Sequence, residues 1–394
     1  MASLYFDHNA TTPLDPFVLE AMLPFMRENF ANPSATYTAG REARRAVEKA
    51  REQVAGALQA DPSEVIFTAS GSEANNLFIQ GMAAAWLDEG HQPATVACST
   101  IEHPCVAEPV KALGRAGWQV QYLDVNANGC VIPGQLTHLP ANTQLLSVMM
   151  ANNETGAIQS VTSLAAAVQN DQSGSRWFHS DAVQAFGKHP LSFQTLKSAG
   201  VHAVTISGHK IGGPKGAAAL VRDRQVPLLP LVYGGGQERG LRSGTENVAA
   251  IVGFGVACSR AVAHLEARAA EVLALQQRLE GWLRSRGAVI FSGSVARLPN
   301  TTFAAFPGID GETLVSLLDR QGIAIASGAA CGSGKQGVSA VLLAMGVEPL
   351  LAKGAIRISL GMMPYGATLS SEVDRLVGQL DVVLGQLQRF AAVA

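Results

Sequence analysis

Hydrophobic and polar positions follow two patterns along this chain. Residues 41–59 place apolar side chains at helical spacing with charges on the other face, which predicts an amphipathic helix. Short apolar runs such as Val65–Thr68 and Ala203–Ser207 are typical of buried strands. Further strands are predicted at Ala94–Cys98, Val120–Leu123, Leu145–Met150, Trp177–His179 and Ala217–Val221, and helices at 73–87, 104–115 and 162–170. Strands that alternate with helices at this spacing predict βαβ units and a mainly parallel, buried sheet.

The last third of the chain predicts a second, smaller unit that follows a long helical region at about 247–286. Its strands are expected near 288–292, 300–306, 323–326 and 355–360, and its helices at 311–321, 338–345 and 370–390. We therefore expect an α/β protein with a large, mainly parallel-sheet domain over 16–260 and a smaller α+β domain over 261–394. The N-terminal arm, residues 1–15, is expected to be part of the small domain.

Composition narrows the class of protein. Apolar residues make up 47% of the 394 residues and charged residues 15%, so the chain can bury a large core. The net charge of −2 and the lack of any Lys/Arg run argue against nucleic-acid or membrane-surface binding. The most apolar stretch, Val248–Cys258, is too short to cross a bilayer, and residues 1–9 lack the pattern of a signal peptide. Five scattered cysteines without a C-x-x-C pair argue against structural zinc and disulfides, and indicate a cytoplasmic protein.

Lys210 is the first candidate for chemistry. It follows a predicted strand and enters the glycine-rich loop GHKIGGPKG. A lysine in such a place is partly desolvated, which favours the neutral, nucleophilic amine. The alternative, a lysine that caps a turn, stays open on spacing alone.

Two other segments place polar groups where strands end. TASGSEANN, residues 68–76, runs from a strand through a Ser/Gly turn into a helix, whose N-terminus could bind a phosphate. Asp181 follows a predicted strand, at the sheet edge where α/β folds bind ligands, and could hold a protonated ring nitrogen. Ordinary helix capping explains either segment equally well on its own.

Nine segments, in order along nearly the whole chain, match one family. They are DHNATTPLDP (7–16), NPSATYTAGREAR (32–44), TIEHP (100–104), NNETGAIQ (152–159), SDAVQAFGK (180–188), SGHKIGGPKG (207–216), GGGQERGLRSGT (234–245), SGAACGSG (327–334) and IRISLG (356–361). The chain closely resembles the pyridoxal-phosphate-dependent cysteine desulfurases, which are class V members of the fold-type-I aminotransferase superfamily.

The resemblance implies pyridoxal 5′-phosphate as cofactor. Lys210 would form the Schiff base, His103 would stack on the ring and act as acid or base, and Asp181 would pair with the ring nitrogen. The other implied contacts are Gln184 with the phenolic oxygen, Asn153 near that oxygen and the substrate, and Gly71, Ser72, Ser207 and His209 with the phosphate. Thr245 would reach the phosphate of the neighbouring subunit in a homodimer.

The implied reaction converts L-cysteine to L-alanine. Arg357 would bind the substrate carboxylate, and Cys331, in the small-residue run SGAACGSGKQG, would accept the sulfur as a persulfide. The persulfide would serve an acceptor protein in iron–sulfur cluster assembly or another sulfur pathway, and the sequence does not say which. A selenocysteine lyase, an aminotransferase and a sulfur-transfer subunit with little activity of its own stay open as alternatives.

The remaining cysteines receive no role. Cys98, Cys130 and Cys258 are expected to be small apolar filler, and Cys105, two residues after His103, is expected to face the helix interior.

Overall fold

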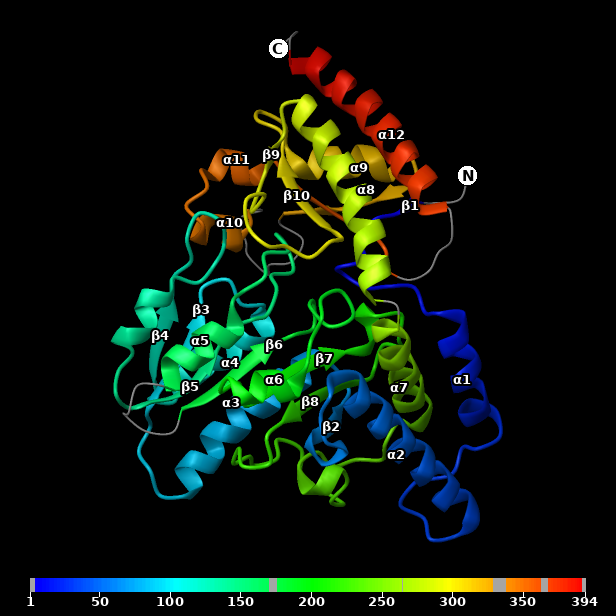
Figure 1. Ribbon diagram of the computed structural model, residues 1–394, viewed down its shortest axis with the longest axis vertical. Coiled ribbons are helices and arrows are strands. Elements are labelled where there is room, and N and C mark those ends of the chain that lie inside the picture. The colour runs from blue at the N-terminus through cyan, green and yellow to red at the C-terminus, as the bar shows by residue number, and fades with distance from the viewer. Residues whose placement is uncertain (1–3, 170–175, 264, 329–337, 363–367, 392–394) are drawn as a thin grey trace.

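The computed structural model describes residues 4–169, 176–263, 265–328, 338–362 and 368–391, with side chains described as far as Leu387. Figure 1 shows a large sheet with helices in the lower part of the view, and a smaller group of strands and helices above it, close to both ends of the chain.

A seven-stranded sheet organises the larger part of the molecule. Its strands, in spatial order, are β2 (Val65–Thr68), β8 (Ala218–Arg222), β7 (Ala203–Ser207), β6 (Trp177–Asp181), β5 (Thr143–Ser147), β3 (Thr95–Ser99) and β4 (Gln119–Leu123). β8 is antiparallel to both of its neighbours, and the other strands all run in one direction. The predicted α/β fold with a mainly parallel sheet is confirmed.

Helices cover both faces of this sheet, because each strand alternates its side chains between two apolar cores. Ile66 of β2 packs in a cluster with α3 (Gly71–Asp88) and α4 (Pro104–Arg115). Its neighbours Val65 and Phe67 pack in another cluster with helices on the opposite face. These helices are α2 (Thr38–Leu58), α5 (Val161–Gln169), α6 (Phe193–Ser198) and α7 (Val248–Val262).

The smaller unit is built on an antiparallel sheet. Its order is β12 (Ala326–Ser327), β13 (Ala355–Ser359), β10 (Thr301–Ala305) and β9 (Val289–Ile290). The helices α8 (Leu265–Ser285), α9 (Gly311–Asp319) and α12 (Thr368–Ala391) share an apolar core with it. The short helices α10 (Ala340–Ala344) and α11 (Pro349–Lys353) pack on the core of the large sheet instead.

The N-terminal arm crosses from one unit to the other. Its strand β1 (Leu4–Tyr5) pairs in parallel with β11 (Ile323–Ala324), so the first residues of the chain join the smaller unit. The exact domain limits stay a prediction. After the arm the chain enters α1 (Pro16–Arg27), which packs against α7 of the large unit.

The structure adds detail to two parts of the predicted organisation. Helix α1 was not among the predicted elements: Asp15 caps it and Pro16 occupies its first turn, but Pro24 lies inside it and interrupts the helical pattern. The predicted helical region at about 247–286 consists of two helices, since α7 ends at Val262 and Ala263 has extended backbone angles before α8 begins at Leu265.

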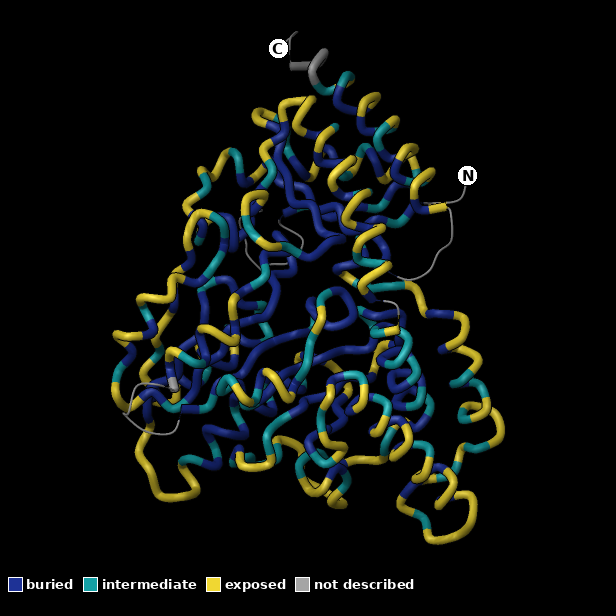
Figure 2. Tube along the Cα trace, viewed as in Figure 1, coloured by how far each residue is buried: buried dark blue, intermediate teal, exposed yellow. Residues whose placement is uncertain are grey.

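Burial follows the two cores (Figure 2). The inner strands of both sheets are buried, whereas the edge strands β4 and β9 and the outer faces of the helices are largely exposed. No helix in the described part of the chain is both long and apolar enough to span a membrane by itself. Only the bent pair α7 and α8 meets that test, jointly, on length and composition alone.

Candidate active site

A cavity of about 410 Å³ lies where the parallel strands of the large sheet end. It brings together ten of the residues singled out in the sequence: Gly71, Ser72, His103, Asn153, Asp181, Gln184, Ser207, His209, Lys210 and Arg357. In a parallel sheet the carboxyl ends of the strands meet at one edge, which is why segments so far apart in sequence converge there.

The N-terminus of α3 forms one end of the cavity. Ser70 caps the helix by accepting a hydrogen bond from the Glu73 amide at 3.1 Å, and Gly71 and Ser72 make the first turn. The amides of a first helical turn have no partner within the helix, and the helix dipole adds positive potential there. This end of the cavity is therefore suited to an anion.

Asp181 is the last residue of β6, and its carboxylate is held on both oxygens. The Val183 amide donates to Oδ1 at 2.9 Å, and the Asn75 side-chain amide donates to Oδ2 at 2.8 Å. Asp181 is 5% exposed, so this charge sits in a nearly dry part of the cavity. A fixed, buried carboxylate is a strong partner for a cationic group of a ligand.

His103 caps α4 and faces the same cavity. Its Nδ1 accepts a hydrogen bond from the Cys105 amide at 3.2 Å. Burial lowers the pKa of His103, and nearby Lys210 lowers it further against the opposing effect of Asp181. The imidazole is therefore disposed to be neutral near pH 7, which allows it to donate at one nitrogen and accept at the other.

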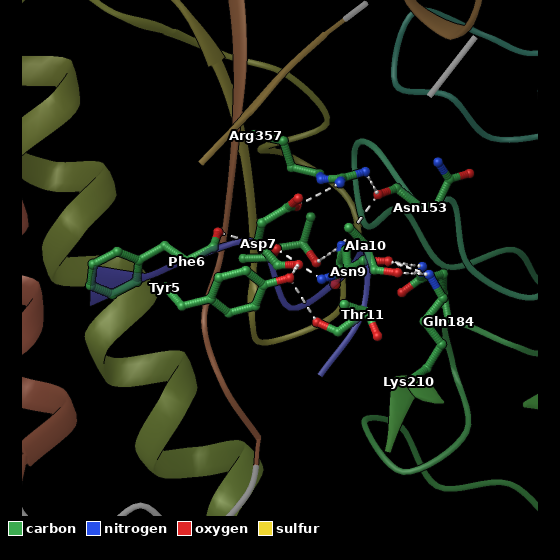
Figure 3. Close-up of polar contacts among 12 residues, drawn as sticks. Tyr5, Phe6, Asp7, Asn9, Ala10, Thr11, Asn153, Gln184, Lys210 and Arg357 are labelled. Atoms are coloured by element: carbon green, nitrogen blue, oxygen red, sulfur yellow. Dashed lines mark hydrogen bonds and ion pairs between the residues drawn. The ribbon is translucent and has the colours of Figure 1, made fainter. Parts of the chain in front are cut away.

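Lys210 ends the short 3₁₀ turn Gly208–Lys210 that follows β7. Its Nζ donates to the carbonyl oxygens of Asn9 and Ala10, at 2.6 and 2.7 Å (Figure 3). The neighbouring His209 contacts Thr11 through Nδ1 at 3.2 Å, and burial lowers its pKa to about 4. The lysine that the glycine loop singled out thus points its amine into the cavity, against the N-terminal arm.

Asn9 of that arm lines the cavity and is almost fully buried. Its Nδ2 donates to the Asn153 carbonyl at 3.2 Å and to Thr301 Oγ1 at 2.9 Å. Its Oδ1 accepts from Lys188 Nζ at 3.0 Å and from Asn300 Nδ2 at 3.1 Å. One side chain therefore ties the arm to both the large and the small unit.

Arg357, on β13, reaches the cavity from the small unit and is 2% exposed. Its Nη2 donates to Asp7 Oδ1 at 2.8 Å and its Nη1 to the Asn153 carbonyl at 2.9 Å (Figure 3). The arm and the loop after β5 therefore fix the guanidinium plane from two sides. A planar guanidinium held in this way presents a fork that matches a carboxylate.

Gln184 and Lys188 lie four residues apart, in the turns that follow Asp181 along the chain. Lys188 Nζ donates to Gln184 Oε1 at 2.7 Å, and Gln184 Nε2 donates to the Asn9 carbonyl at 2.8 Å. Lys188 is fully buried, and burial together with the positive charge of Lys210 holds its pKa well below the usual range. This pair fixes which way the Gln184 amide faces.

Glu154, next to Asn153, lies at a smaller neighbouring cavity of about 340 Å³, to which His103 also contributes. Its Oε2 contacts the hydroxyl of Ser339, which caps α10. Burial raises the pKa of Glu154 to about 7.

Two predicted site residues are not part of the cavity as described. Thr245 is exposed and is not among the described residues that line it. Cys331 lies outside the described residues.

The structure corrects the expectation for Cys105. Its thiol does not face the helix interior but lines the cavity, 2.8 Å from His103 Nδ1 and 3.8 Å from Asp181 Oδ2. Cys98 and Cys258 are fully buried, as expected of apolar filler, and Cys130 is half-buried.

Sequence reasoning also gave no role to Asp7, Asn9 and Lys188. The segments DHNATTPLDP and SDAVQAFGK contain them and were noted as motifs. Their functions in the cavity depend on contacts with residues more than 100 positions away, which no local spacing reveals.

Comparison with known proteins gives a consistent result. The family model described as "Aminotransferase class-V" matches residues 4–376. A cysteine desulfurase of Nostoc sp. is 39% identical over 391 residues, covering 98% of this chain and 94% of that protein. The cysteine desulfurase IscS of Methanosarcina thermophila is 38% identical, covering 99% of this chain and 94% of that protein. A solved structure titled "NIFS-LIKE PROTEIN" has a TM-score of 0.89 and 38% identity, and covers 97% of this chain and 99% of that one.

Proposed function

The chain belongs to the aminotransferase class-V family, and on that premise we propose that it is a cysteine desulfurase. It would convert L-cysteine to L-alanine and transfer the sulfur to Cys331 as a persulfide, with pyridoxal 5′-phosphate as cofactor. One observation carries the proposal: the amine of Lys210, the carboxylate of Asp181 and the guanidinium of Arg357 line one cavity.

The chemistry of these groups fits the cofactor. The first turn of α3, with Gly71 and Ser72, is suited to its phosphate, and a side chain at position 71 would meet Val183 at 3.0 Å. Asp181 is suited to a protonated pyridine nitrogen, and the Lys210 amine to the aldehyde. When bound, pyridoxal phosphate acts as an electron sink for a carbanion at the substrate's Cα.

The chain's own residues would do the rest. Arg357 would hold the substrate carboxylate, because its fork is already oriented by Asp7 and Asn153. Lys210, once released from the cofactor, would take the Cα proton. His103 would assist the protonation that precedes the release of alanine. The Cys331 thiolate would attack the substrate sulfur while the bond between that sulfur and the substrate's Cβ breaks, with the electron pair of that bond staying on the carbon fragment. The outer sulfur of the resulting persulfide would then pass to a thiol of an acceptor protein.

We further propose a homodimer in which Thr245 reaches the phosphate of the partner's site. Thr245 is exposed, and so are several large apolar side chains on and after α1 and just before the glycine-rich segment 234–245. They include Phe17 at 67%, Phe30 at 82% and Tyr233 at 76% exposure. Exposed apolar surface of this kind is suited to a protein interface.

Cys331→Ser tests the function. The variant should keep the visible absorbance of the bound cofactor and bind L-cysteine, because Lys210, Asp181 and Arg357 are unchanged. Alanine formation from L-cysteine should fall by about a thousandfold, since a hydroxyl cannot replace the thiolate as sulfur acceptor. Cys130→Ser, a half-buried cysteine away from the cavity, is the matched control and should stay active.

The same experiment separates the alternatives. Selenocysteine turnover that survives in Cys331→Ser, without cysteine turnover in the parent, would indicate a selenocysteine lyase. Unchanged desulfuration by Cys331→Ser would rule out Cys331 as the acceptor and the mechanism with it. A parent protein that takes up no pyridoxal phosphate would rule out the enzyme altogether.

A further inference from the structure

Cys105 is a thiol inside the candidate active site that the proposed reaction does not use. It lies in the first turn of α4, after Pro104, and lines the cavity together with His103 and Asp181. Burial and the negative charge of Asp181 raise the pKa of its thiol to about 12. At neutral pH it therefore keeps its proton, which makes it a poor nucleophile but leaves it an S–H donor.

The proton positions around Cys105 follow from its neighbours. The Cys105 backbone N–H points at His103 Nδ1, 3.2 Å away, so Nδ1 acts as an acceptor and carries no proton in the neutral ring. The Cys105 sulfur is 2.8 Å from the same nitrogen. Between these two atoms only the thiol can supply the hydrogen.

A second residue orients the thiol from the other side. Asn75 of α3 points its side-chain nitrogen at Asp181 Oδ2 and at Cys105 Sγ, at 2.8 and 3.0 Å. A carboxylate only accepts hydrogen bonds, so the contact with Asp181 identifies that atom of Asn75 as the donor. Asn75 thus gives one hydrogen to Asp181 and one to the sulfur. The S–H then has two acceptors within reach, His103 Nδ1 at 2.8 Å and Asp181 Oδ2 at 3.8 Å, and the nitrogen is much the nearer.

We propose that Cys105 is a positioning residue whose thiol donates to His103 Nδ1 and so holds His103 in the tautomer protonated on Nε2. The Nε2–H is then the hydrogen-bond donor of the ring, and His103 lines the cavity. A neutral His103 of this form can donate a hydrogen bond from Nε2 to a group bound in the cavity. This inference rests on the proposed function for its meaning in catalysis, but the hydrogen-bond arrangement is a property of the protein itself.

The test reads the tautomer directly. Full-length protein labelled with ¹⁵N in its histidine rings would be compared as parent, Cys105→Ala and Cys105→Ser, with His103→Gln to assign the His103 signals. Parent and Cys105→Ser should show the Nε2–H pattern of ring nitrogen shifts at pH 7, because a serine hydroxyl also donates. Cys105→Ala should show a larger share of the Nδ1–H tautomer than the parent, because only the backbone N–H then donates to Nδ1.

The pKa of His103 provides a second readout. Loss of a donor that favours the neutral ring should raise the pKa of His103 by about half a pH unit in Cys105→Ala. The other charged groups near the ring, Asp181 and Lys210, are unchanged in all three proteins. Cys130→Ala serves as the matched control, and it should leave both the tautomer and the pKa of His103 as in the parent.

Two results would overturn the proposal. If Cys105→Ala keeps the parent's tautomer and pKa, the backbone N–H alone positions the ring. If Cys105→Ser changes His103 as much as Cys105→Ala does, the sulfur acts by packing and not as a donor. Neither readout requires turnover, so a parent protein that forms no alanine from L-cysteine would contradict the proposed function while leaving this test intact.

Discussion

The two walls of the cavity are assembled in different ways. The sheet wall (Gly71, Ser72, His103, Asp181 and Lys210) consists of residues that each lie within a few positions of a strand's carboxyl end. The arm wall (Asn9, Ala10 and Arg357) combines the first residues of the chain with a strand of the small unit. Asp7 and Arg357, which form its ion pair, are 350 positions apart.

The two walls therefore differ in what they contribute to the site: one supplies reactive groups, and the other closes and orients the cavity. The sheet wall supplies the amine, the imidazole and the carboxylate, and neighbouring backbone largely places each of them. The arm wall closes the cavity and orients Arg357 through hydrogen bonds between distant segments. We therefore expect substitutions in the sheet wall to abolish the reaction, and substitutions in the arm wall to weaken binding or stability.

The largest effect is expected from Lys210→Ala, in the sheet wall. Without the amine, alanine formation from L-cysteine should fall by about a thousandfold or more, because both the covalent bond to the cofactor and the base are lost. In the parent, borohydride reduction with cofactor bound, followed by peptide mass spectrometry, should place the pyridoxyl group on Lys210.

Lys215, in the same glycine-rich loop, provides the control. Lys215→Ala should retain activity and still be labelled at Lys210. A label on Lys215 in the parent would contradict the assignment of Lys210, and with it the view that the sheet wall supplies the chemistry.

A smaller effect is expected from Arg357→Lys, in the arm wall. Lysine keeps the charge but loses the planar fork, so kcat/KM for L-cysteine should fall by about 30- to 100-fold, mainly through a higher KM. Arg297→Lys, a mostly buried arginine paired with Glu280 in the small unit, should leave both constants near those of the parent. If Arg357→Lys lowers kcat and leaves KM unchanged, Arg357 acts in the chemical step, and the proposed difference between the two walls is wrong.

The same division explains what could be predicted from the sequence. The strands β2 and β7 and the helix α4 begin and end where their apolar runs and caps indicate, since these signals are local. The residues of the sheet wall could be predicted for the same reason, because a lysine, a carboxylate and a helix start each follow a recognisable strand. In contrast, no periodicity in residues 4–10 indicates that Asn9 will meet Lys188 and Asn300.

Cys105 shows a further limit of sequence reasoning. From the sequence it was expected to face the helix interior, but in the structure it lies next to the cap residue His103 and lines the cavity. At the ends of helices, capping contacts and not the 3.6-residue repeat decide where a side chain points.

Asn9→Ala should affect stability more than any single side chain of the sheet wall. The change removes the side chain's hydrogen bonds and takes one acceptor from each of two buried donors, the Lys188 amine and the Asn300 amide. The free energy of unfolding should fall by about 2–4 kcal/mol, measured by urea denaturation. Asn32→Ala, which removes one exposed hydrogen bond to the Ser34 amide, should cost less than about 1 kcal/mol. Equal losses in the two variants would mean that the arm wall does not depend on Asn9.

The smallest effect is a change in how stability depends on pH. It tests the contact beside the cavity between Glu154, in the loop after β5, and Ser339, the N-cap of α10. Glu154 joins the loop after β5 to Ser339 of α10, and burial raises the pKa of Glu154 from its usual 4.5 to about 7. Between these two values the folded protein holds a proton that the unfolded chain releases, so this group lowers the stability of the folded state as the pH rises from about 4.5 to 7.

Glu154→Gln keeps a hydrogen-bonding side chain but cannot titrate. As the pH rises from 5 to 8, the free energy of unfolding of Glu154→Gln should therefore increase by about 1–3 kcal/mol relative to that of the parent. Glu42→Gln, on an exposed face of α2, should show no such change relative to the parent. Parallel pH dependence of the parent and Glu154→Gln would mean that the carboxyl group titrates alike in the folded and unfolded chain. The link between the loop after β5 and α10 would then be insensitive to pH.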